Sequence, residues 1–265
     1  MTGSRYGLPV LNTVGLAVML ALNGMANALP INGITTAAVS DRYDNLFVPA
    51  GLTFAIWGLI YLLLTAFVVY QWLMGRRMSG GPTPADRIGI WFFVSCLANA
   101  GWILAWHYEQ LPLSLALMLV LLACLLFVYM RLGIGAAAAP RGERYLCHLP
   151  FSVYLGWITV ATIANVSALL VSVKWDAFGL SEQFWAVAVI AVAIIIALAM
   201  AFRRGDIYFC LVVDWALIGI LLKRTADAAT PDRAVEVACI AGIVLVSAAI
   251  LIRVAQRRVY RPRSA

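Results

Sequence analysis

Charged residues are scarce in this chain. Asp, Glu, Lys and Arg make up 12% of its 265 residues, whereas soluble domains carry about 25%. Hydrophobic residues amount to 64%, and the mean hydropathy is +0.93. So little polar surface cannot coat a globule in water, and continuous apolar runs are unlike the alternating pattern of a membrane β-barrel. The composition therefore predicts an all-α polytopic membrane protein.

Catalytic constellations are also lacking. The chain has two histidines, and no Ser/His/Asp set, H-x-x-x-H motif, P-loop or G-x-G-x-x-G motif is found in it. General acid–base chemistry has few groups to draw on, and no metal site or catalytic residue is indicated. The sequence favours a role without catalysis and keeps an enzyme open as a weaker alternative.

Paired cysteines are missing as well. None of the five cysteines belongs to a C-x-x-C motif, and all lie within or at the edge of apolar runs. We expect small unpaired core residues rather than disulfides or a zinc site. The five are Cys96, Cys124, Cys147, Cys210 and Cys239.

What the chain has in abundance is apolar runs of roughly 20 residues, the length that crosses a bilayer as a helix. We count eight of them. They are residues 10–28, 51–73, 88–108, 111–131, 148–173, 184–202, 207–222 and 234–254. The first run, with Arg5 before it and Ala26-Asn27-Ala28 at its end, also mimics a cleaved signal peptide. The charge distribution fits better if it is retained as a span.

The positions of Lys and Arg predict the orientation. Alternating eight spans with both termini in the cytoplasm leaves 14 of the 19 basic residues inside. The five outside are Arg42, Lys174, Lys223, Arg224 and Arg233. Because the net charge of +7 sits at the ends of spans rather than on a water-soluble stripe, no nucleic-acid partner is expected. The localisation expected is the inner, cytoplasmic membrane of a bacterium.

A change in composition near residues 174–183 predicts the domain organisation. Earlier spans are rich in Trp, Tyr and Asn, whereas the sixth and eighth are plain Ala/Val/Ile runs. We expect a five-helix ligand-binding bundle over 1–173, an appended three-helix segment over 174–254 and a basic cytoplasmic tail over 255–265 that contacts anionic headgroups. Residues 35–44 are predicted to form a short helix over the outer mouth of the bundle.

Polar and aromatic side chains inside the spans indicate a candidate site, because unpaired polar groups are costly in hydrocarbon. In the third span, Asn99, Trp102 and Trp106 share one helical face. Trp106 also suits an interfacial belt. His107 beside it has three possible roles: an axial ligand to a porphyrin metal, a titrating switch, or an interfacial histidine that meets water.

Two further spans carry similar stripes. In the second, Trp57 and Tyr61 lie four residues apart, so they stack on one face. The fifth has a stripe at spacings of 3, 4 and 4, in which the small Ala161 leaves room for a ligand. Its members are Tyr154, Trp157, Ala161 and Asn165. A neighbouring stripe of Ala164 and Ala168 suits close helix contact.

Asp214 stands alone in the seventh span, about 12 Å from the inner end at 1.5 Å per residue. No basic residue is expected at that depth. We expect a neutral acid, or a hydrogen bond to Asn, Ser, Thr or Tyr groups of neighbouring helices. A proton-coupled role is the alternative.

These motifs resemble the tryptophan-rich sensory protein / translocator protein family (TspO/MBR) over residues 10–173. The family's Y-x-x-W-x-x-x-A-T-x-x-N pattern is matched by Tyr154, Trp157, Ala161, Thr162 and Asn165. Its L-N-x-x-W pattern is matched by Asn99 and Trp102, with Ala98 in place of Leu. Its W-x-x-x-Y pattern after a proline is matched by Trp57 and Tyr61 after Pro49. The last three spans have no counterpart in the family's five-span fold.

The resemblance implies a pocket that opens outward and binds tetrapyrroles, sterol-like molecules or other flat hydrophobic ligands. It also implies dimers in the membrane. No cofactor is required, although heme, a porphyrin or a lipid is a possible bound molecule. The favoured function is a membrane receptor or sensor. The alternatives are a proton-coupled transporter that uses Asp214, a structural subunit of a membrane complex and, most weakly, an enzyme that acts on porphyrins.

Overall fold

The computed structural model describes residues 6–29, 31–77, 82–136, 138–226 and 232–259. These residues form helices and turns, with no strand among them. Eight of the helices have 17 residues or more, and each lies on one of the eight apolar runs. They are α1 (Gly7–Ala28), α3 (Ile56–Arg77), α5 (Trp91–His107), α6 (Leu111–Arg131), α8 (Leu149–Ser172), α9 (Glu182–Ala199), α10 (Ile207–Ala226) and α11 (Arg233–Val259).

Short helices occupy the connections. They are η1 (Ile31–Gly33), α2 (Thr36–Arg42), η2 (Gly51–Ala55), α4 (Pro84–Ile88), α7 (Arg141–Glu143), the π-helix η3 (Arg144–His148), η4 (Ala177–Gly179) and the π-helix η5 (Met200–Arg204). The helix predicted over 35–44 is confirmed as α2, and the Thr35 hydroxyl caps it by accepting from the Ala38 amide at 3.3 Å.

One predicted boundary is wrong at the start of the third run. A separate helix, α4, ends at Ile88, and α5 begins only at Trp91. Thr83 and Asp86 form a capping box that starts α4, and Gly89 stops it with a positive φ of 64°. A local turn signal therefore interrupts what looks like one continuous apolar run.

Six of the long helices have the length and apolar composition to cross a membrane. The other two are α5, which has only 17 residues, and α10, which carries Asp214 together with Lys223 and Arg224. Burial inside the protein tolerates a shorter or more polar helix than lipid does. The expected count of eight spans and the orientation of the termini stay predictions.

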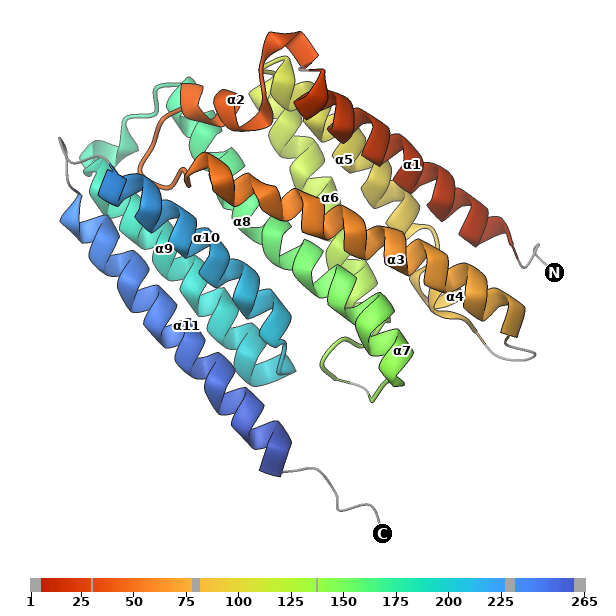
Figure 1. Ribbon diagram of the computed structural model, residues 1–265. Helices are drawn as coiled ribbons and strands as arrows, with labels where there is room; N and C mark the ends of the chain where they lie inside the picture. Colours follow the sequence, from red (N-terminus) through yellow and green to blue (C-terminus); the bar gives the residue numbers. More distant parts are fainter. Residues whose placement is uncertain (1–5, 30, 78–81, 137, 227–231, 260–265) are drawn as a thin grey trace. The chain divides into compact units, whose positions relative to one another are not determined.

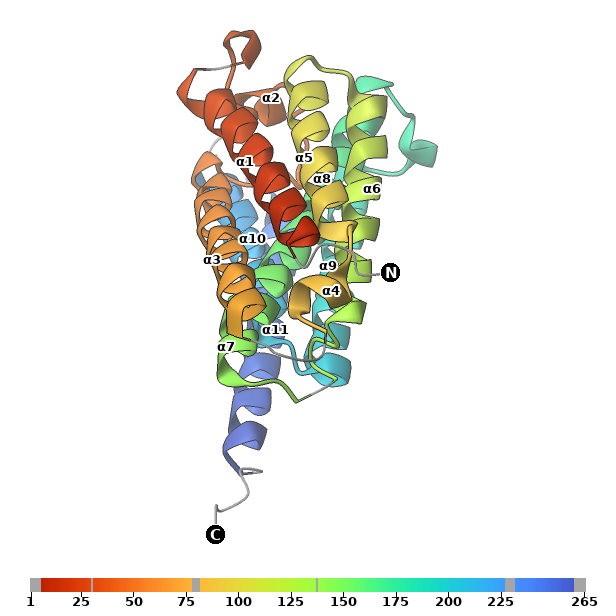
Figure 2. The same cartoon turned by 90° about the vertical axis from the view of Figure 1, so that its right-hand side faces the viewer.

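The chain forms two compact units. Unit 1 comprises residues 1–44 and 54–175, and unit 2 comprises 45–53 and 176–265. In unit 1, α5 packs against α1 and α6, α6 packs against α8, and α3 contacts α1 and α8. Figures 1 and 2 show these five helices side by side, with α2 across one end and α4 and α7 at the other.

An apolar aromatic triad holds the centre of unit 1 together. Phe67, Phe92 and Phe151 come from α3, α5 and α8 and are fully buried. Their rings meet edge to face at centroid distances of 4.9–5.5 Å. Edge-to-face packing at this spacing is favourable beyond simple area burial, so the triad fixes how these three helices face one another.

Unit 2 contains α9, α10, α11 and the segment 45–53, which we call the strap. The strap lies against α10: the Ala50 amide donates to the Gly219 carbonyl at 2.9 Å, and the Trp215 indole donates to the Thr53 carbonyl at 2.9 Å. The Leu46 amide donates to Glu182 at the start of α9. A stretch that the sequence places between α2 and α3 is therefore built into unit 2.

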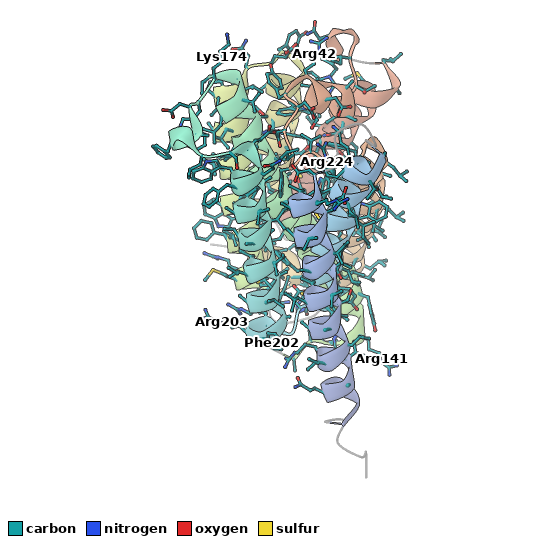
Figure 3. All side chains as sticks on the ribbon, turned by 90° about the vertical axis from the view of Figure 1, so that its left-hand side faces the viewer. Arg42, Arg141, Lys174, Phe202, Arg203 and Arg224 are labelled. Carbon is teal, nitrogen blue, oxygen red and sulfur yellow. The ribbon has the colours of Figure 1, made fainter. Side chains whose placement is uncertain are left out.

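Basic residues mark opposite ends of each unit. In unit 1, Arg42 and Lys174 lie at one end and Arg141 at the other, as Figure 3 shows. In unit 2, Arg224 lies toward one end and Arg203 at the other. Both ends of each unit therefore carry basic residues. All five cysteines are free and buried, as predicted.

Candidate functional site

Four of the predicted residues gather around Trp57 on α3. The Trp57 ring stacks on Tyr61 at 5.6 Å and on Trp102 of α5 at 5.7 Å, measured between centroids. It meets Tyr154 and Trp157 of α8 edge to face, each at 6.2 Å. The spacing within each helix places its rings on one face, and the packing of α3, α5 and α8 brings these faces together. We call these five residues the aromatic cluster.

Two indole N–H groups in the aromatic cluster have no partner. Trp102 and Trp157 are 4% and 3% exposed, and no described residue accepts a hydrogen bond from either Nε1. A buried donor without an acceptor costs about 1–3 kcal/mol. Since most buried polar groups are paired, two such donors in one cluster set it apart from the rest of the core.

Trp106 belongs to a different environment. Its ring stacks on Trp102 at a centroid distance of 6.2 Å, but its Nε1 donates to the Thr36 carbonyl of α2 at 3.2 Å. The indole therefore holds the short helix over the end of α5. Its placement fits a structural anchor at the rim of the aromatic cluster.

His107 is fully buried and has both ring nitrogens in use. Nδ1 lies 3.0 Å from the Ile31 carbonyl, and Nε2 lies 3.1 Å from the Thr36 hydroxyl. A carbonyl can only accept, so Nδ1–H donates to it, and Nε2 is paired with the Thr36 hydroxyl. Neither ring nitrogen is therefore free to bind a porphyrin metal.

Glu109 completes the attachment of residues 31–43, which we call the cap, to the end of α5. Its carboxylate pairs with Arg42 and accepts from the Tyr43 hydroxyl at 2.7 Å. Burial, followed by the hydrogen bond to Glu109, raises the pKa of Tyr43 from 10.0 to about 12. Asn32 adds a bond from its amide to the His107 carbonyl at 3.1 Å. The cap is thus held by charged, aromatic and backbone groups together.

Asn99 lies in a buried network rather than beside an open space. Its Oδ1 accepts from Asn23 of α1 at 2.7 Å, and its Nδ2 donates to the Tyr154 hydroxyl at 3.0 Å. Asn23 also donates to the Met19 carbonyl, and Tyr154 donates to the Met19 sulfur at 3.8 Å. The network ties α1, α5 and α8 together and includes Tyr154 of the aromatic cluster.

Asn165 has a similar structural partner. Its Nδ2 donates to the Ser114 hydroxyl of α6 at 3.0 Å, and both side chains are buried. Ala161 lies one turn earlier on the same stripe and is half-buried. The amide of Asn165 is already paired with Ser114. Asn23 and Ser114 were not predicted. A polar residue within an apolar run was the signal available for each.

Asp214 in unit 2 also bonds to a neighbouring helix. Its Oδ2 accepts from the Ser247 hydroxyl of α11 at 3.0 Å, while Oδ1 is buried without a hydrogen-bond partner among the described residues. The expected hydrogen bond to a neighbouring helix is therefore confirmed. No group of His, Cys, Asp and Glu in the described part of the chain could hold a metal ion.

Comparison with known proteins shows which family the sequence matches. A family model described as TSPO-like protein matches residues 9–252, which is most of the chain and includes α9 and α10 as well as the five long helices of unit 1, three of which carry the motifs. No curated protein and no solved structure matched. Together with the apolar helices, this match makes the chain an integral membrane protein. The protein belongs to the TSPO-like family.

Proposed function

We propose that this protein is a membrane receptor or sensor that binds a flat hydrophobic ligand, of tetrapyrrole or sterol-like type, at the aromatic cluster. The observation that carries the proposal is the pair of buried, unpaired indole N–H groups of Trp102 and Trp157. They lie among stacked rings that would offer a flat ligand its largest contact surface.

The chemistry of the cluster favours a ligand with acceptor atoms at its rim. Indole N–H is a donor only, so carbonyl or carboxylate oxygens at the periphery of the ligand would suit it. His107, with both nitrogens in use, offers no axial ligand. A metal-free porphyrin therefore fits these residues better than heme.

The proposed setting is eight spans with both termini in the cytoplasm of a bacterium and the cap on the outer side. The cap would then cover the aromatic cluster from outside, because Trp106 and His107 connect it to the end of α5 that carries Trp102. A homodimer and bound lipids belong to the same proposal.

The test is a titration with protoporphyrin IX that follows the porphyrin's own absorbance, so that changes in tryptophan content do not affect the readout. Trp102→Phe and Trp157→Phe keep an aromatic ring and remove one donor each. Each should weaken binding roughly fivefold, the effect of about 1 kcal/mol. Trp91→Phe is the control, because that ring stacks on Phe127 away from the cluster.

Unchanged affinity in both cluster variants, or the absence of saturable binding, would refute this use of the indoles. Equal weakening in the Trp91 control would point to a general loss of structure instead.

The second candidate function is a proton-coupled transporter, favoured by the buried, unpartnered Oδ1 of Asp214. Asp214→Asn keeps an acceptor for Ser247 but cannot exchange a proton. Substrate flux into proteoliposomes that depends on a pH gradient and is lost in this variant would support coupling. Flux that persists in the variant would exclude Asp214 from it.

A further inference from the structure

A group of three ionisable side chains lies at the end of unit 1 away from the cap. The Glu143 carboxylate of α7 pairs with the Arg87 guanidinium of α4, and the same oxygen, Oε1, lies 3.3 Å from Nε2 of His148 in η3. Figures 1 and 2 show α4 and α7 together at this end. The side chains of Glu143 and His148 are only 13% and 9% exposed. We call these three residues the charged triad; because two partners share one oxygen, the charge of each acts on the others.

The charged triad joins the helices that carry the aromatic cluster. Arg87 lies near the end of α4, which leads into α5, and His148 directly precedes α8. Helix α3 approaches at Gly142, where an added Cβ would lie 3.4 Å from Cε2 of the Tyr70 ring. These three long helices are the ones whose rings meet at Trp57. A change in the charged triad therefore acts on the ends of all three.

The turn that holds His148 is a π-helix, η3, and not a regular α-helical turn. The Leu149 amide donates to the Arg144 carbonyl five residues earlier, which is the π pattern. Pro150 follows, and because a proline has no amide hydrogen and crowds the carbonyl four residues before it, the regular pattern fails here. Single π turns are rare and occur frequently at functional sites. Cys147 within this turn is 0% exposed, so its thiol reports whether the turn is closed.

The protonation of His148 decides the charge balance of the triad. With a neutral imidazole, the charges of Arg87 and Glu143 cancel. With an imidazolium, two cations share one carboxylate and one positive charge is left over. A mostly buried charge without an anion is costly, because its removal from water is not compensated. The closed arrangement therefore disfavours a proton that an opened turn would accept.

The elements around His148 carry more basic than acidic residues. Of the described groups, Glu143, Arg87 and Arg144 act electrostatically on the imidazole. Asp86, the other acid nearby in the chain, is engaged in the capping box that starts α4. Residues 78–82, between α3 and α4, contain no Asp or Glu. The ionisable residues of η3, of α4 and of the facing ends of α3 and α7 are Tyr70, Arg76, Arg77, Asp86, Arg87, Arg141, Glu143, Arg144, Tyr145, Cys147 and His148.

We propose that the charged triad is a pH-sensitive latch: protonation of His148 opens its contact with Glu143 and loosens the neighbouring ends of α5 and α8. Because the opened state binds the proton more readily, the closed latch is fully stable above the ordinary titration range of histidine, about pH 6.5. It loses stability as the pH falls through that range. In the proposed orientation this end lies in the cytoplasm, so the signal would be cytoplasmic acidification.

The experiment measures how fast Cys147 reacts in the full-length protein in maltoside micelles. The probe is dithiodipyridine, a disulfide reagent that modifies thiols at acidic as well as neutral pH, and peptide mass spectrometry identifies the modified cysteine. Rates are compared at about pH 7.5 and about pH 5.5, on either side of the histidine range. Cys124 of α6, which is also buried, is the internal reference for effects of pH on the reagent.

In the wild type, the rate at Cys147 relative to Cys124 should rise at least about threefold on acidification, because one linked proton changes an equilibrium by up to about tenfold per pH unit. His148→Gln keeps an N–H donor for Glu143 but gains no charge, so its ratio should not change with pH. His107→Gln is the matched control: it removes the other histidine, which lies at the cap, and the response at Cys147 should persist.

A wild-type ratio that stays constant or falls on acidification overturns the proposal, and so does an acid response that persists in His148→Gln. If that variant does not fold, NMR of histidine-labelled wild type decides, because the chain has two histidines and so two ring signals. The rate at Cys147 should follow the titration of the signal that remains in His107→Gln. A rate that does not follow it refutes the latch. The test uses no porphyrin, so its outcome is independent of the proposed receptor function.

Discussion

Gly219 is the position at which a single added methyl group should do the most damage. A Cβ built there would lie 2.0 Å from the Thr53 hydroxyl oxygen, 2.8 Å from its Cγ2 and 2.9 Å from its Cβ. All three distances are shorter than real Cβ contacts allow. The strap cannot simply retreat, because its Ala50 amide and Thr53 carbonyl are both hydrogen-bonded to α10 at 2.9 Å.

The size of the effect follows from these contacts. Overpacking costs about 1–3 kcal/mol, and two weakened hydrogen bonds add about 1 kcal/mol each. Replacing a helical glycine with alanine returns up to about 1 kcal/mol. Gly219→Ala should therefore destabilise the protein by about 2–4 kcal/mol, measured by denaturant titration in detergent with tryptophan fluorescence.

Two variants make the reasoning refutable. Gly58→Ala is the control, because Gly58 also lies in a long helix but a Cβ there meets nothing within 4 Å; its stability should stay within about 1 kcal/mol of wild type. Thr53→Gly removes all three clashing atoms, so the double variant should recover at least about 1 kcal/mol relative to additivity. A Gly219→Ala protein as stable as wild type, or no recovery, would show that the close approach of the strap is not as described.

Two further predictions concern unit 1. Asn99→Leu should lower stability by about 2 kcal/mol, because it removes one hydrogen bond from the Asn23 amide and one from the Tyr154 hydroxyl, each buried. Melting in detergent tests this. Lost porphyrin affinity with unchanged stability would show instead that Asn99 orients the ligand. The raised pKa of Tyr43 means that the folded state holds the phenol proton more tightly, so stability should fall as the pH rises from 10.0 toward about 12. Glu109→Gln should reduce that fall, followed by tyrosinate absorbance and unfolding across the same range; an identical fall in the variant would remove Glu109 as a cause.

The long helices could be predicted from the sequence because each depends on a local property, the length of an apolar run. That Trp57 and Tyr61, or Tyr154 and Trp157, share a helical face could be predicted for the same reason. That these faces meet Trp102 of α5 was implied by the family resemblance and not by the spacing. Whether that surface binds a ligand stays a prediction. The boundary between α4 and α5 was not predicted, although Thr83, Asp86 and Gly89 signal it. Ile88 and Ile90 on either side of Gly89 make the apolar run look continuous.

The partners of the buried amides could not be predicted. Asn99 and Asn165 were predicted as members of the candidate ligand site, and the structure pairs them with Asn23 and Ser114, 76 and 51 residues away in the chain. Which polar residue of one helix meets which of another depends on how the helices are rotated about their axes. A single sequence does not give that rotation. For the same reason, the contacts of His107 with Thr36 and Ile31 in the cap could not be predicted.

The strap changes how the last three helices are understood. By sequence they look appended after residue 173, yet residues 45–53 pack in unit 2 and are joined to the cap at one end and to η2 and α3 at the other. Without α9 and α10, the amides of Leu46 and Ala50 and the carbonyl of Thr53 would lose their partners. The next residue, Phe54, meets Trp157 edge to face at 6.1 Å. A family match that continues to residue 252 agrees with this dependence, since the strap needs the later helices for its hydrogen bonds.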